Sequence, residues 1–172
     1  MATALGGEDA FRRINGSTPI YVTRVKNGAG AASRSGSITL GDDVFNQQNL
    51  TQAADKELGA SIAVVHELAH IWDRGRTNLL QKFNPFIYGE ISEGLKSYVA
   101  NEKGPTAYAL TNNVEDWAES VAAYIYPDYL NLLNDPSRNS KYEKEIRDHG
   151  GPADLQQKHR EFVSLQISYL SR

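Results

Sequence analysis

The sequence predicts one α+β domain that is mainly helical, with a small β-sheet near its N-terminus and helices over most of the remaining chain. Three observations favour this class: β-branched, partly alternating segments near the N-terminus, helical spacing of apolar residues from Thr51 onward, and further helical segments toward the C-terminus. A chain of 172 residues can bury one core. We therefore expect a single domain over residues 1–172, with residues 1–16 flexible.

Two strands are predicted in the N-terminal region. Ile20–Val25 and Ser37–Leu40 are β-branched and partly alternate between apolar and polar residues, which is typical of a half-buried sheet. The glycine, alanine and serine residues between them show no periodicity, so we expect a mobile loop over residues 28–37.

A helical pattern begins at Thr51, where Gly59 is expected to break the helix and Gly75 to end it. The part after Gly59 carries an apolar stripe that would pack against a core: Ile62, Val65, Leu68, Ala69 and Trp72. Residues 76–107 mix glycine, proline and asparagine with short apolar clusters. We expect them to form a long structured excursion that contributes walls to a site.

Two more helices are predicted in the C-terminal half. The first covers Val114–Tyr126, with Asn112 or Asn113 as its N-cap and Pro127 just beyond its end. The second covers about Ala153–Leu170, with four residues at near-helical spacing expected in the core: Leu155, Phe162, Leu165 and Tyr169.

Composition excludes several classes of function. The formal charge of −3, from 18 basic and 21 acidic residues spread along the chain, predicts no binding to nucleic acid or to an anionic membrane. The apolar runs are too short for a membrane span, and the start of the chain lacks the apolar core of a signal peptide. Because the chain has no cysteine, a metal ion would have to be held by imidazole and carboxylate groups.

The segment Val65-His66-Glu67-Leu68-Ala69-His70 has the pattern HExxH. On a helix, His66 and His70 lie one turn apart on the same face, where one zinc ion can bind both. Glu67 points about 100° around the helix axis, so its carboxylate can reach a metal-bound water as a general base. Zinc lowers the pKa of such a water to about 7. Asp73 continues the histidine face and could orient an imidazole.

Two helical histidines leave a zinc site incomplete, so a third protein ligand must come from elsewhere in the chain. Glu115 and Glu119 lie four residues apart and share one face of the helix predicted over Val114–Tyr126. We expect Glu115 to complete the ligand set for one zinc ion. Glu119 would accept a hydrogen bond from a ligand histidine and fix its tautomer.

These two segments resemble the gluzincin metallopeptidases, and within them the anthrax lethal factor-like group that includes the Pro-Pro endopeptidases. HELAHIWD resembles the group's HExxHxxD segment. YALTNNVEDWAES resembles the segment in which a tyrosine precedes the ligand glutamate by seven residues and a second glutamate follows by four. The resemblance, over about residues 61–126, implies a zincin-like fold with zinc ligands His66, His70 and Glu115. It also implies Glu67 as the base and Tyr108 as the hydroxyl that stabilises the oxyanion.

We therefore expect a monomeric zinc endopeptidase that hydrolyses a peptide or protein substrate, and we favour a secreted protein or a toxin or effector module. A strand near Ile38 would lie at a sheet edge and hold the peptide by strand addition. Two alternatives stay open. One is a zinc-binding interaction domain without catalysis, and the other is a helical domain in which the motif is incidental and no metal binds.

Other polar residues are assigned outside the site. His149 precedes Gly150-Gly151-Pro152 and is expected at a helix C-terminus, where a cation suits the helix dipole. His159 has basic neighbours and is expected at the surface. Glu90 and Glu93 could line a groove, but exposed carboxylates are far commoner.

Overall fold

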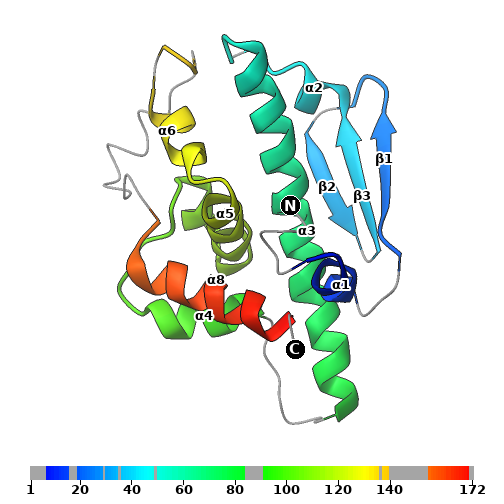
Figure 1. Ribbon diagram of the computed structural model, residues 1–172, viewed down its shortest axis with the longest axis vertical. Helices are drawn as coiled ribbons and strands as arrows, with labels where there is room; N and C mark the ends of the chain where they lie inside the picture. The colour runs from blue at the N-terminus through cyan, green and yellow to red at the C-terminus, as the bar shows by residue number, and fades with distance from the viewer. Residues whose placement is uncertain are drawn as a thin grey trace.

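The chain is organised around one long helix, α3 (Ala53–Phe83), which runs between a small sheet on one side and a group of shorter helices on the other (Figure 1). The predicted α+β class, mainly helical with a small N-terminal sheet, is confirmed. None of the described helices combines the length and the apolarity needed to cross a membrane. The structure is a computed structural model and describes residues 7–15, 19–28, 30–34, 36–48, 50–83, 91–135, 137–139 and 155–170.

The sheet has three strands: β1 (Tyr21–Val25), β2 (Ala31–Arg34) and β3 (Ser37–Gly41), in the order β1-β3-β2. β1 is parallel to β3, and β2 is antiparallel to it. Both predicted strands are confirmed, but the mobile loop expected between them is wrong, because it contains β2. Gly36 has a φ of 73° and lets the chain turn back so that Arg34 pairs with Ser37. Backbone hydrogen bonds to β3 define this strand. Its side chains are mostly small and do not alternate, which is why the sequence did not predict it.

The expectation of an edge strand near Ile38 is also wrong. β3 is the central strand, and the Ile38 side chain is fully buried. The strand edge that faces the long helix belongs to β2, where Arg74 of α3 donates from Nη1 to the carbonyl of Ser33 over 3.0 Å. A third strand takes the edge position that two strands alone would have left to β3.

Helix α3 does not break at Gly59 and does not stop at Gly75, so both of these predictions are wrong. A glycine inside a helix costs only about 1 kcal/mol, which the packing of a long buried helix can offset. At Gly59 the missing side chain also makes room for Gln47, because a Cβ there would lie 2.6 Å from Gln47 Oε1. The predicted apolar stripe from Ile62 to Trp72 is confirmed as buried.

Helix α5 (Asn113–Ile125) agrees with the prediction, and its N-cap is Asn112. The Asn112 side-chain oxygen accepts hydrogen bonds from the backbone N–H groups of Val114 and Glu115, each over 3.0 Å. This cap fixes the first turn of α5, and therefore the position of Glu115 along the helix axis.

The last helix, α8 (Gln157–Leu170), begins after two described non-helical residues, 155 and 156. Leu155 and Phe162 are buried as predicted, whereas Leu165 and Tyr169 are more than half exposed, so their assignment to the core is wrong. Of the N-terminal residues expected to be flexible, 8–15 form a helical segment in which Ala10 and Ile14 are buried. The remaining helices are α1 (Glu8–Arg12), η2 (Arg13–Asn15), α2 (Asp42–Phe45), α4 (Ile91–Val99), η3 (Tyr108–Thr111) and α6 (Asp128–Asn134).

His159 is fully buried, so the prediction of a surface position is wrong. Its Nδ1 lies 3.0 Å from Glu102 Oε2, and its Nε2 lies 3.2 Å from Asp116 Oδ1. Burial lowers the pKa of His159, but hydrogen bonds and charges from Asp116 and Glu102 outweigh it and raise the pKa above its usual value. Two carboxylates from separate segments thus hold an imidazolium in the core and join α8 to α5.

Because the folded pKa of His159 is raised, its contribution to stability is fully present below the unfolded pKa and is lost as pH rises through the folded pKa. We expect His159→Gln to reduce the free energy of unfolding of the metal-free protein by about 2 kcal/mol at about pH 6. The difference in unfolding free energy between the variant and the wild type should narrow as the pH rises through the raised pKa of His159. Urea unfolding at several pH values measures this, with the exposed Lys158→Gln as a matched control. A difference that stays constant with pH would contradict the assignment of an imidazolium.

Candidate metal centre

Helix α3 places both histidines of the HExxH motif on its buried side. His66, Glu67 and His70 are all buried, and the rings of His66 and His70 meet edge to face at 4.7 Å between centroids. Trp117 of α5 donates from Nε1 to the carbonyl of Ala69 over 3.0 Å, which fixes α5 against this turn of α3. The two predicted segments, far apart in the sequence, therefore lie side by side.

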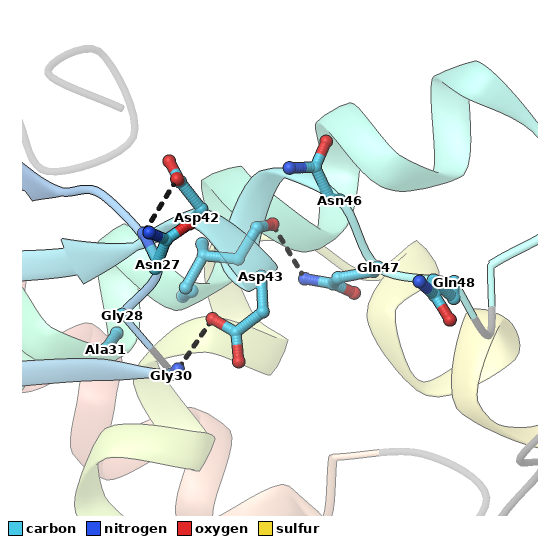
Figure 2. Close-up of a pocket in the computed structure, with 11 residues that line it drawn as sticks. Asn27, Gly28, Gly30, Ala31, Asp42, Asp43, Asn46, Gln47 and Gln48 are labelled. Carbon is cyan, nitrogen blue, oxygen red and sulfur yellow. Dashed lines mark hydrogen bonds between the residues drawn. The ribbon is translucent and has the colours of Figure 1, made fainter.

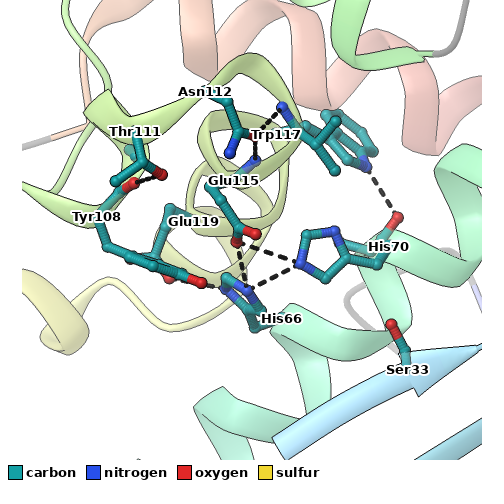
Figure 3. A network of polar contacts seen from close by, with 12 residues as sticks. Ser33, His66, His70, Tyr108, Thr111, Asn112, Glu115, Trp117 and Glu119 are labelled. Carbon is teal, nitrogen blue, oxygen red and sulfur yellow. Dashed lines mark hydrogen bonds and ion pairs between the residues drawn. The ribbon is translucent and has the colours of Figure 1, made fainter.

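Glu115 of α5 meets the histidines of α3, as predicted (Figure 3). Its Oε2 lies 3.0 Å from His66 Nε2 and 3.3 Å from His70 Nε2, and the two Nε2 atoms lie 3.0 Å from each other. Among the described residues, this is the one group of three such donors close enough together to hold a metal ion.

The spacing and chemistry of these three atoms fit a metal ion. His66 Nδ1 lies 2.7 Å from Glu119 Oε1, so Nδ1 carries the proton and Nε2 keeps its lone pair in the neutral ring. Glu115 Oε2 is buried, and His66 Nε2 and His70 Nε2 are its close polar neighbours. Electron-rich atoms at these distances repel each other unless a proton or a cation lies between them. Tetrahedral zinc, with bonds of about 2.0–2.1 Å, would place its ligand atoms about 3.4 Å apart, close to the observed spacing.

The pKa shifts of these residues in the metal-free chain agree with a cation site between them. Burial lowers the pKa of His66, but the hydrogen bonds that its ring donates to Glu115 and Glu119 outweigh this effect and raise the pKa to about 9. Burial and the charge of His66 lower the pKa of His70. The hydrogen bond with His66 lowers the pKa of Glu115. A divalent cation at the same point would compete with the proton on His66.

Glu119 lies where the sequence predicted, one turn after Glu115 and in contact with His66 Nδ1. Asp73 is almost fully buried. It accepts hydrogen bonds from the backbone N–H and the hydroxyl of Ser92, over 3.0 and 2.9 Å. These two bonds hold the start of α4 against α3. The role of Asp73 in orienting an imidazole stays a prediction.

Glu67 and Tyr108 both line a cavity of about 330 Å³ next to His66. Within the described part of the chain, the buried Glu67 carboxylate makes no hydrogen bond or ion pair. The Tyr108 ring lies 5.9 Å from the His66 ring. Burial and the charge of Glu115 raise the pKa of Tyr108, so its hydroxyl keeps its proton and remains a hydrogen-bond donor.

Four apolar residues also line this cavity: Leu50, Ile62, Leu132 and Leu133. A second, more open cavity of about 780 Å³ adjoins it and shares Ala31, Gln47 and Ala63 with it. Figure 2 shows that this second cavity is lined mainly by carboxylates and carboxamides, with Asp43 accepting from Gly30 N–H over 2.6 Å.

Comparison of the chain with protein-family models, with curated proteins and with solved structures gives no match. The geometry of the site therefore carries the functional argument.

Two residues of the site were missed by sequence reasoning. Tyr129 of α6 donates its hydroxyl to Glu119 Oε2 over 2.8 Å, and Arg74 joins the His70 carbonyl to Ser33 of β2. Arg74 could have been found, since it continues the histidine face by one turn, whereas no spacing links Tyr129 to the motifs. Glu93 lies on α4 and accepts from Asn113 instead of joining the site. Residues 90 and 149 lie outside the described residues.

Proposed function

We propose that this chain is a zinc-dependent endopeptidase of the kind that its HExxH and Glu115 segments resemble. The observation that carries the proposal is the approach of His66 Nε2, His70 Nε2 and Glu115 Oε2 to within 3.0–3.3 Å of one another. This group lies beside a buried carboxylate, Glu67, that has no other partner among the described residues. Two imidazoles and one carboxylate are a donor set found in catalytic zinc sites.

A zinc ion held by these three residues would polarise the carbonyl of a peptide bond and make an attacking water more acidic. Glu67 would accept the proton of that water on its carboxylate and pass it to the leaving amine. Tyr108 would donate its hydroxyl to the oxygen on which negative charge develops. Glu119 would keep the proton of His66 on Nδ1, which leaves Nε2 for the metal.

A peptide substrate would lie between α3 and the outer edge of β2. The Ser33 carbonyl points away from β3 toward Arg74, and in an antiparallel pair the groups of Ala31, two residues earlier, point the same way. Ala31 lines both cavities, so an extended peptide that pairs with it would pass the metal donors. The apolar pocket beside Glu67 would take an apolar side chain of that peptide.

A cleavage profile of a peptide library tests the proposal. The full chain is incubated with the library in zinc, after removal of metal by a chelator, and after zinc is added back. We expect cleavage that is lost with the chelator and restored by zinc. Stoichiometric zinc without cleavage of any peptide would overturn the proposal in favour of a non-catalytic zinc-binding domain.

We expect Tyr108→Phe to lower kcat about ten- to a hundredfold with zinc content unchanged. Removal of a fully enclosed oxyanion donor lowers kcat by about 10²–10³. The loss in Tyr108→Phe should be smaller because Tyr108 is 52% exposed and water can partly replace its hydroxyl. Steady-state kinetics on one library-derived peptide measure the effect. Tyr98→Phe on α4, another exposed tyrosine, is the matched control. A wild-type kcat in the Tyr108 variant would remove this residue from the mechanism.

A further inference from the structure

We propose that Tyr129 is a positioning residue of the metal centre, which holds Glu119 and, through Glu119, the ligand His66. The inference rests on the metal site of the proposed function, but it does not depend on peptide cleavage. It assigns a role to α6, a helix that the motifs do not include.

The contacts form a continuous chain of hydrogen bonds. The Tyr129 hydroxyl donates to Glu119 Oε2 over 2.8 Å, and Glu119 Oε1 lies 2.7 Å from His66 Nδ1. Glu119 is only 4% exposed, so water contributes little to its solvation. Both carboxylate oxygens are therefore satisfied by protein groups, one on each side.

Two anchored oxygens fix the rotation of the Glu119 carboxylate, whereas one anchored oxygen would let it turn about its last bond. The orientation of the carboxylate in turn fixes the plane and the tautomer of the His66 ring. Loss of the hydroxyl would also leave a buried oxygen of Glu119 without a partner. Either effect lowers the fraction of molecules in which His66 Nε2 points at the shared centre.

The phenol itself is held in place by the attachment of α6 to α3. Asp128, the residue before Tyr129, accepts from Arg138 Nη2 over 2.7 Å, and the same nitrogen donates to Asp55 near the start of α3 over 2.7 Å. Asp55 is buried and Arg138 is partly buried. Both ends of the hydrogen-bond chain are thus tied to the helix that carries the histidines. Tyr129 also lines the 330 Å³ cavity, so its ring borders the space next to the metal donors.

The test is the zinc affinity of the full-length Tyr129→Phe variant, which keeps the ring and removes the hydroxyl. Zinc binding is measured by competition with a chromophoric chelator at fixed pH, and the melting temperature is measured on the metal-free protein. We expect about tenfold weaker zinc binding, the lower end of the range for groups that support a metal ligand. The metal-free melting temperature is compared with that of Tyr126→Phe, which removes a hydroxyl three residues earlier and should bind zinc like the wild type. Tyr129→Phe should melt at a lower temperature because a buried Glu119 oxygen loses its partner, so zinc binding is measured well below that temperature, where both variants are folded.

A double variant shows whether Tyr129 acts through Glu119. If it does, Tyr129→Phe should cause no further loss of zinc affinity in a Glu119→Ala background. Equal zinc affinity in the wild type and Tyr129→Phe, or additive losses in the double variant, would overturn the proposal. Because the readout is zinc affinity, a chain that binds zinc but cleaves no peptide would overturn the proposed function and still decide the role of Tyr129.

Discussion

Glu67→Gln is expected to lower kcat/KM for peptide cleavage about a thousandfold while zinc stays bound, within the 10²–10⁴ range of general acid–base catalysis. Glutamine has nearly the same shape but cannot accept the proton of the attacking water. Glu67 is not part of the group formed by His66, His70 and Glu115, so the metal donors remain intact. Kinetics on a single peptide, with zinc measured on the same samples, give both quantities.

Glu57→Gln is the matched control for this variant, because it makes the same change on an exposed position of the same helix. Its activity and zinc content should equal those of the wild type. Full activity in the Glu67 variant would refute the mechanism, whereas loss of zinc from it would place Glu67 among the ligands.

Glu115→Gln is expected to weaken zinc binding about a hundredfold and to abolish cleavage at limiting zinc. About 10–16 kcal/mol of zinc binding, shared among four ligands, corresponds to about 3 kcal/mol for each, which is about a factor of a hundred in affinity. The amide also removes the negative charge that partly balances the cation between His66 and His70. Chelator competition measures the affinity.

Folding should not explain that loss, because Glu115 is partly exposed and lies on the capped first turn of α5. Far-UV circular dichroism and the melting temperature of the metal-free variant check this. Unchanged zinc affinity in Glu115→Gln would mean that a different group completes the ligand set.

The parts of the site that could be predicted from the sequence depend on local rules. His66 and His70 share a helix face because of their spacing, and the stripe from Ile62 to Trp72 buries that helix. The sequence offered Asn112 or Asn113 as the N-cap of α5, and the structure has Asn112 in that role. The meeting of Glu115 with the histidines followed from the need for a third ligand, and the structure brings the three together.

The remaining features depend on contacts between distant segments, which no local pattern records. β2 is placed by its pairing with β3, and Gly59 leaves room against α3 for the side chain of Gln47. His159 is buried because Glu102 and Asp116, far away in the sequence, neutralise it. Tyr129 reaches the site because α6 folds back toward α3, although no motif contains it.

The central claim is that His66, His70 and Glu115 hold one zinc ion. X-ray absorption at the zinc edge of the full chain, with metal content by elemental analysis, tests it most directly and separates zinc from iron(II), which accepts a similar donor set. We predict one zinc per chain, with imidazole nitrogens and a carboxylate oxygen at about 2.0–2.2 Å, and loss of imidazole scattering in His66→Ala. A chain that takes up no zinc, or that binds zinc without histidine ligands, would contradict the claim.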